Sequence, residues 1–201
     1  MTFAPKPALE HRSQCKSPGG RPRSEEADVA ILDATNDLFC ELGYEGLSIE
    51  AVAARAGVAK TTIYRRYPTK LDLVIAANGC MSKGMIPTPD TGSLRADLVA
   101  IAQGYRRMLR ETDVGRAIPM MMAAKAKNPE LARAHEVFVQ EKRDLTIGVI
   151  RRGIERGEMP SDTDPVLVAD LLTGAVFQRV FVTGQPVTAR YLDALVDQIL
   201  S

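Results

Sequence analysis

One segment limits what this chain can fold into more than any other: residues 48–70, which read SIEAVAARAGVAKTTIYRRYPTK. Ser48 is suited to cap a helix, and apolar residues recur after it at helical spacing: Ile49, Val52, Ala53 and Ala56. Gly57 follows at once, and glycine ends a helix in the left-handed conformation at the least cost. A second helix is expected from Lys60, and Pro68 prevents it from running far. The segment therefore predicts two short helices joined by a tight turn.

Another helix is predicted directly after this pair. Thr69 is suited to be its N-cap, and Asp72 stands three residues later, where the acidic half of a capping box belongs. A helix, a glycine turn, a short helix, a proline and a third helix follow in the order of a helix-turn-helix domain, whose second helix enters a DNA groove.

Charged residues near this segment are separated by sign, although the whole chain is almost neutral. The sequence has 26 Lys and Arg against 25 Asp and Glu, a formal net charge of +1. Residues 24–54 contain acids but no base: Glu25, Glu26, Asp28, Asp33, Asp37, Glu41, Glu45 and Glu50. Residues 55–70 contain bases but no acid: Arg55, Lys60, Arg65, Arg66 and Lys70. We therefore expect a local basic surface around the second short helix, as contact with phosphates requires.

Residues 1–23 differ in composition from the rest. They contain five bases and one acid in a sequence broken by proline and glycine, which cannot bury enough apolar surface to form a core. We predict a disordered basic arm. Its GGRPR segment, with Arg21 and Arg23, is suited to lie along a minor groove beside the helix-turn-helix.

The stretch AGVAKTTIYRRYPTKLDLV, with ILDATNDLFCELGYEGLSIEAVA before it, resembles the DNA-binding domain of the TetR family of bacterial transcriptional repressors over residues 24–75. The resemblance implies that Ser48 meets a phosphate and that Lys70 neutralises another. It also implies that the groove-facing surface consists of Lys60, Thr61, Thr62 and Tyr64, with Arg65 among the bases of the same helix.

Ala59 departs from the family pattern, since many members carry Ser or Thr there. The second helix therefore lacks a side-chain N-cap, a loss of about 1 kcal/mol by typical magnitudes. The sequence leaves open whether this weakens DNA binding.

The remainder of the chain shows helical spacing and no strand-like alternation. We predict an all-α protein with a three-helix, N-terminal helix-turn-helix domain at residues 24–70. A C-terminal helical bundle at residues 71–201 would bind a ligand and dimerise. The 45% apolar content is ample for both cores.

The last two predicted helices, which start after Asp164 and Thr188, indicate how the chain assembles. The first is apolar on nearly all sides, and a chain of this length has few helices left to cover it. We expect a second subunit to cover it in a symmetric four-helix contact. The alternative is that the helix is buried within one chain. The family resemblance implies the same homodimer, and two reading helices suit a palindromic operator. The predicted interface residues are Leu171, Leu172, Val176, Val180, Leu192, Leu195, Val196 and Ile199.

The middle helices are rich in adaptable apolar side chains, which suit a pocket for a small, largely apolar effector. Candidate pocket residues are Tyr105, Met108, Met121, Phe138 and Phe177. Plain core packing is the alternative for each of them. The resemblance implies that an effector bound there repositions the helix at residues 71–80.

Other function classes find little support. The chain has two histidines and no cluster of ligand residues, phosphate loop or nucleophile motif, so we predict no metal, no cofactor and no enzyme. Its three cysteines lack CxxC spacing and indicate neither a disulfide framework nor a zinc site. The apolar segment 166–182 contains Asp170 and Arg179, so we expect it to be buried in protein and not in lipid. With no apolar leader, we expect a cytoplasmic protein.

The sequence thus predicts a TetR-like DNA-binding transcriptional regulator. We expect it to be a repressor that a small effector releases from its operator. The alternatives are a helical effector-binding module without DNA binding and, with less support, an all-α enzyme.

Overall fold

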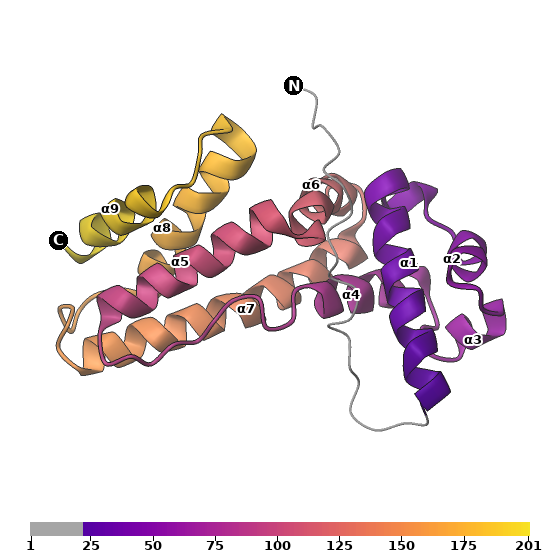
Figure 1. The fold of residues 1–201 in the computed structure, drawn as a ribbon, viewed down its shortest axis with the longest axis horizontal. Coiled ribbons are helices and arrows are strands. Elements are labelled where there is room, and N and C mark those ends of the chain that lie inside the picture. Colours follow the sequence, from indigo (N-terminus) through magenta and orange to yellow (C-terminus); the bar gives the residue numbers. More distant parts are fainter. Residues whose placement is uncertain (1–21) are drawn as a thin grey trace. The chain divides into compact units, whose positions relative to one another are not determined.

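In a computed structural model of the chain, residues 22–201 are described, and every regular element among them is a helix (Figure 1). The predicted all-α class is confirmed for this part of the chain. The residues form two compact units. The N-terminal unit comprises residues 22–83 and 116–131, and the C-terminal unit comprises residues 84–115 and 132–201.

The N-terminal unit is built from α1 (Pro22–Gly46), α2 (Ile49–Ala56), α3 (Lys60–Tyr64), α4 (Lys70–Met81) and most of α6 (Asp113–Lys125). Helix α1 packs against both α2 and α4. The centre of the core is apolar and fully buried, and includes Ile31, Phe39, Val52, Ile63 and Val74.

The predicted helix ends of this unit are present. The Ser48 side chain accepts a hydrogen bond from the Ala51 amide at 3.2 Å, and Gly57 ends α2 with φ of 67°. Ala59 precedes α3 without a side-chain cap, whereas Thr69 and Asp72 form the expected capping box on α4. These ends depend on local chemistry, which is why the sequence predicts them.

The boundary between the units differs from the one that we expected at residue 70. Helix α4 belongs to the N-terminal unit because it buries Leu73, Val74 and Ala77 in the same core as α1. The Asn36 side chain also donates a hydrogen bond to the Ala77 carbonyl at 3.2 Å. Met121 of α6 lies in this core as well.

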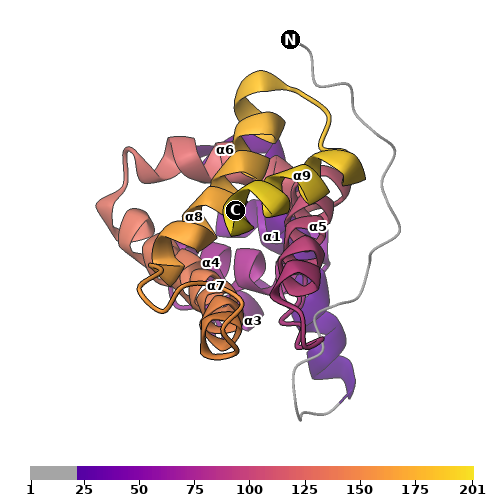
Figure 2. The same cartoon turned by 90° about the vertical axis from the view of Figure 1, so that its left-hand side faces the viewer.

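The C-terminal unit contains α5 (Leu94–Glu111), most of α7 (Pro129–Glu155), α8 (Pro165–Phe177) and α9 (Ala189–Leu200). A π-helical turn, η1 (Gln178–Thr183), extends α8. Helix α5 packs against α8 and α9, and α7 lies beside them (Figure 2). The interior of this bundle includes Leu98, Ile101, Ile150, Leu172 and Leu192, all fully buried.

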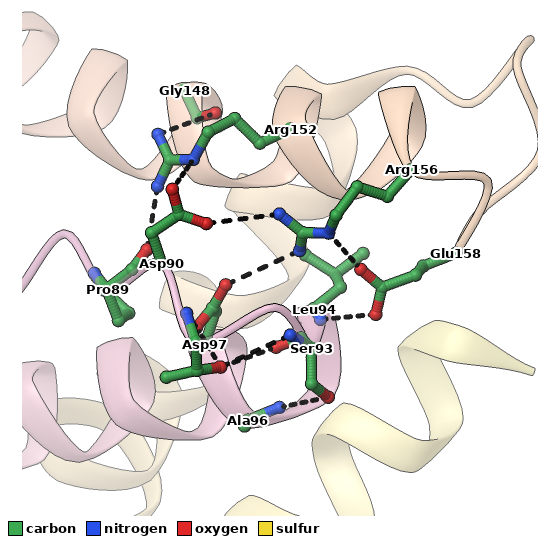
Figure 3. A network of polar contacts seen from close by, with 11 residues as sticks. Pro89, Asp90, Ser93, Leu94, Ala96, Asp97, Gly148, Arg152, Arg156 and Glu158 are labelled. Atoms are coloured by element: carbon green, nitrogen blue, oxygen red, sulfur yellow. Dashed lines mark hydrogen bonds and ion pairs between the residues drawn. The ribbon is translucent and has the colours of Figure 1, made fainter.

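A network of charged groups fastens the segment before α5 to the end of α7 (Figure 3). Arg156 lies 2.6 Å from Glu158, 3.3 Å from Asp90 and 3.7 Å from Asp97. Asp97 is fully buried, and its Oδ1 also accepts from the Thr91 amide at 3.0 Å and the Thr91 hydroxyl at 2.7 Å. The buried carboxylate is thus paired and hydrogen-bonded, as burial of a charge requires.

Among the described residues, one helical stretch, Pro165–Thr183, is long and apolar enough to cross a membrane by length and composition. A single stretch of this kind is weak support for a membrane span. Only 28% of its most apolar window is buried within this chain, so most of that window is exposed in a single copy.

Candidate nucleic-acid interface

Helix α3 has one buried anchor and an exposed face. Ile63 is fully buried, and its carbonyl accepts hydrogen bonds from the Arg66 and Tyr67 amides at 2.9 and 2.8 Å. The exposed face carries Lys60, Thr61, Tyr64 and Arg65, whereas Thr62 is half-buried. Tyr64 leaves 48% of its surface in solvent, so its ring and hydroxyl are available for contact. The predicted groove-facing residues are therefore accessible, Thr62 only in part.

Three bases of the predicted basic surface form ion pairs with acids of α1 and α2. Arg55 makes two contacts with Glu41, at 2.8 and 2.9 Å, and Lys60 lies 3.0 Å from Glu50. Arg66 lies 2.8 Å from Asp28. Folding thus brings the acidic and basic stretches of the sequence together. Sequence reasoning missed these pairs because it compared charges along the chain and not across helices.

The pKa values of two of these pairs shift accordingly. The hydrogen bond from Lys60 lowers the pKa of Glu50, and the same contact raises the pKa of Lys60. Likewise, the contact with Arg55 lowers the pKa of Glu41. Each pair is therefore fully charged at neutral pH.

The Lys70 side chain is held by backbone carbonyls. Its ammonium donates to the Tyr44 carbonyl at 2.8 Å and the Leu47 carbonyl at 3.2 Å, and lies 4.4 Å from the Tyr44 ring centroid. The side chain is half-buried and directed at the corner between α1 and α2. Lys70 thus satisfies carbonyls where α1 ends. The sequence signal for this role is the pair Gly43 and Gly46, which ends α1 and leaves carbonyls without helical partners.

Ser48 and the basic arm complete the set of predicted DNA contacts. Ser48 is half-buried and acts as the N-cap of α2, so its side chain already has a backbone partner. Arg21 and the side chain of Arg23 lie outside the described residues.

Both parts of the chain match known families. Residues 31–77 match the model for bacterial regulatory proteins of the tetR family. Residues 88–199 match the model for the C-terminal domain of tetracyclin repressor-like proteins. The chain belongs to the TetR family. It is therefore a DNA-binding transcriptional regulator.

Individual relatives agree. The HTH-type transcriptional regulator YdeS of Bacillus subtilis is 32% identical over 182 residues, which cover 90% of this chain and 91% of that protein. The crystal structure of the TetR family transcription regulator SCO0332 has a TM-score of 0.70 and 30% identity, and the match covers 87% of this chain and 97% of that one. FadR from Bacillus subtilis, crystallised in complex with stearoyl-CoA, shares the fold with a TM-score of 0.71 at 19% identity, over 86% of this chain and 97% of that one.

Most of the predicted interface residues of this TetR-family chain face its own core. Five of the eight are buried within the chain, four of them fully and Val180 with 7% exposed: Leu172, Val176, Val180, Leu192 and Val196. Their assignment to the interface is wrong. Leu195 and Ile199 are half-buried, and Leu171 is 52% exposed. The sequence misassigned these faces because α8 is apolar nearly all round, so that periodicity does not show which stripe is inward.

An apolar surface remains exposed on α8 and η1. It consists of Val166, Leu167, Leu171, Phe177 and Val182, and we call it the α8 face. Phe177 packs on Phe181 at 4.6 Å between ring centroids. Phe177 was a predicted pocket residue, but its position places it on this outer surface.

The other predicted pocket residues lie in two separate units. Met121 is buried in the core of the N-terminal unit. Tyr105, Met108 and Phe138 are half-buried in the C-terminal unit, on α5 and α7. Burial raises the pKa of Tyr105. Met121 therefore belongs to a different core from the other candidate pocket residues, which are all in the C-terminal unit. Within residues 22–201, no group of three or more His, Cys, Asp or Glu side chains is placed to hold a metal ion.

Proposed function

We propose that this TetR-family protein is a homodimeric repressor that binds a palindromic operator and is released by a small, largely apolar effector. The observation that supports operator reading is the exposed face of α3, in which Lys60, Thr61, Tyr64 and Arg65 stand over the buried anchor Ile63. Since the major groove admits an α-helix and displays a different pattern for each base pair, a short helix with such a face suits direct readout.

Side-chain chemistry indicates which part of the DNA each residue of this face would contact. Arg65 and Lys60 are long cations that reach phosphates or the acceptor edge of guanine. Thr61 and the ring of Tyr64 offer apolar contact to a thymine methyl group, and their hydroxyls offer hydrogen bonds. The N-terminus of α2, capped by Ser48, adds backbone amides that favour a phosphate.

The α8 face supports the homodimer. Its large apolar side chains are 36% to 66% exposed in one chain, and exposed apolar side chains gathered on one helix suit burial against a partner. Nothing lies within 4 Å of where a Gly174 Cβ would stand, so a helix of a second copy has room to approach there. A two-fold contact presents two α3 helices, and the half-sites they read would lie about one helical turn apart.

The effector proposal is supported by the half-buried side chains of Tyr105, Met108 and Phe138 on α5 and α7. Aromatic and thioether groups suit an apolar ligand. The complex of FadR with stearoyl-CoA shows that one protein of this fold binds a ligand with a long acyl chain. As a regulator of bacterial transcription, the protein would act in the cytoplasm, where its partners would be DNA and the effector, and not a membrane.

Selection of bound duplexes from a random-sequence pool tests operator binding. We expect the enriched sequences to be palindromic, with half-sites about one turn apart and two chains bound per duplex. Enrichment of a single unrepeated motif with one chain bound would contradict the dimeric arrangement. Recovery of no sequence above background would contradict operator binding itself.

A separate measurement tests the effector. Acyl-CoA thioesters and free fatty acids would be screened for a rise in Tm and then for release of the selected duplex. A ligand that raises Tm and lowers DNA affinity supports the proposal, because such a ligand must bind the two states unequally. Replacement of Tyr105 by Ala should abolish both effects. If neither class of ligand shifts Tm or DNA affinity, the effector is not of this apolar kind.

A further inference from the structure

We propose that the ion pair with Glu50 holds Lys60 in the free protein and weakens its binding to any DNA. Only when α3 docks closely does Lys60 exchange the carboxylate for a phosphate or base of the DNA. Glu50 would thus be a specificity-determining residue, although it contacts no base. The inference depends on the proposed role of Lys60 at the DNA surface.

The two residues belong to consecutive helices of the helix-turn-helix. Lys60 is the first residue of α3, and Glu50 lies in the first turn of α2. Lys60 Nζ and Glu50 Oε1 are 3.0 Å apart. Because Glu50 is two residues from Ser48, its carboxylate lies beside the helix end that is proposed to meet a phosphate.

This pair differs from the two ion pairs of the unit described above, Arg55–Glu41 and Arg66–Asp28. The side chains of Lys60 and Glu50 are 54% and 62% exposed, whereas those of Arg66 and Asp28 are 15% and 23% exposed. A covered pair is a structural contact, while an exposed one is weak and exchanges readily. Lys60 also lies on α3 itself, whereas Arg55 is on α2 and Arg66 follows the end of α3. The Lys60–Glu50 pair is therefore the one suited to open on binding.

Two effects of Glu50 oppose DNA binding. Its carboxylate occupies hydrogen-bonding capacity of the ammonium that a phosphate or a guanine would use. It also brings a negative charge toward the DNA backbone, where like charges repel. Loose encounters, in which Lys60 keeps its carboxylate partner, are weakened by both effects. In a closely docked complex, contacts of the whole α3 face offset them.

A double-mutant cycle tests the inference with full-length protein. Glu50→Gln, Lys60→Gln and the double variant would be compared with wild type, and Glu45→Gln would be the matched control. Glu45 is also exposed and lies in the same unit, so its replacement changes net charge equally without touching Lys60. The probes are a fluorescent random-sequence duplex and the selected operator, both at low salt.

The expected result is tighter binding of the random duplex by Glu50→Gln, by about two- to five-fold relative to Glu45→Gln, in line with a weak exposed pair. The gain should be smaller for the operator, and most of it should disappear when Lys60 is Gln, because the two sites are coupled. Unchanged circular dichroism and Tm would confirm that helix α2 is intact.

Three results would overturn the inference. An equal gain in Glu45→Gln, or a gain that persists in the Lys60→Gln background, would show general charge repulsion without a role for the pair. Weaker operator binding by Glu50→Gln would show that Glu50 itself accepts a hydrogen bond from DNA. Failure of the wild type to bind any duplex would instead overturn the proposed function, and with it this inference.

Discussion

At the scale of single residues, Lys70 is a cation of the helix-turn-helix that backbone groups hold in place. Its ammonium is held by the carbonyls of Tyr44 and Leu47 and lies over the Tyr44 ring. Gly43, with φ of 70° and ψ of −179°, breaks the helical path just before this point, so nearby carbonyls lack helical partners. Lys70 therefore ties the start of α4 to the corner between α1 and α2.

Replacement of Lys70 by Met should destabilise the protein by about 1 to 3 kcal/mol, because two carbonyls lose a charged donor. Urea unfolding measures this loss. The slope of log affinity against log salt for DNA should stay at its wild-type value in this variant. A slope reduced by about one, with unchanged stability, would instead support the phosphate contact implied by the family resemblance.

Glu158 provides a pH-dependent contribution to stability. Its carboxylate accepts from the Leu94 amide at 2.5 Å and pairs with Arg156, and these contacts lower its pKa from the ordinary value of 4.5. A lowered pKa means that the stabilisation is fully present above 4.5 and is lost as pH falls through the lower, folded-state value.

The variant Glu158→Gln keeps an acceptor for the Leu94 amide but cannot ionise. We expect it to have a lower Tm than wild type near neutral pH, with the difference shrinking as the solution is acidified below about pH 4.5. Thermal unfolding of both proteins across this range is the measurement. A difference that grows on acidification would contradict the assigned direction of the shift.

At the scale of elements, α5 is closely packed with the segment that precedes it. A Cβ on Gly104 would stand 2.5 Å from Pro87 Cδ and 3.2 Å from the Met85 carbonyl oxygen. The proline ring is stiff and the carbonyl belongs to the backbone, so neither yields easily. The opposite end of the same segment is fastened by Arg152, which donates to the Pro89 carbonyl at 2.8 Å (Figure 3).

Gly104→Ala should therefore lower the free energy of unfolding by about 1 to 3 kcal/mol, the usual effect of overpacking. Gly148→Ala is the matched control, since nothing lies within 4 Å of its Cβ position in α7. The control should be neutral or stabilise by up to about 1 kcal/mol through helix propensity. Equal effects of the two substitutions in chemical denaturation would show that close packing at Gly104 is unimportant.

The sequence predicts where helices begin and end better than it predicts which side of a helix faces the core. The caps at Ser48, Thr69, Asp164 and Thr188 are local and are all present. The inward stripe of α8 was not predictable, because apolar residues surround it and the partner elements are distant in sequence. The π-helical turn at Gln178–Thr183 was missed for a similar reason, since nothing in its residues departs from an ordinary helical pattern.

At the scale of the whole molecule, the α8 face connects the structure of one chain to its assembly. Leu171 is 52% exposed there, while its neighbour Leu172 is fully buried in the bundle. Only the first of these side chains is available to a second copy. The sequence could therefore point to α8 as the proposed interface, but which of its residues are exposed could be known only from the bundle.

Leu171→Glu should convert the proposed dimer to a monomer. Operator binding should weaken by at least about tenfold, because the two α3 helices would no longer be linked in one molecule. Leu42→Glu is a suitable control, since Leu42 is 53% exposed on α1 in the other unit. Light scattering gives the mass of each variant. A dimer that survives Leu171→Glu unchanged would place the contact elsewhere.

The central claim is that the exposed face of α3 reads DNA, and Tyr64→Ala tests it most directly. Tyr64 is exposed beside the buried Ile63, so the substitution should leave Tm and dimer mass unchanged. We predict that its affinity for the selected operator, measured by fluorescence anisotropy, falls about tenfold, which corresponds to about 1.4 kcal/mol. Wild-type affinity in a correctly folded Tyr64→Ala protein would contradict the claim.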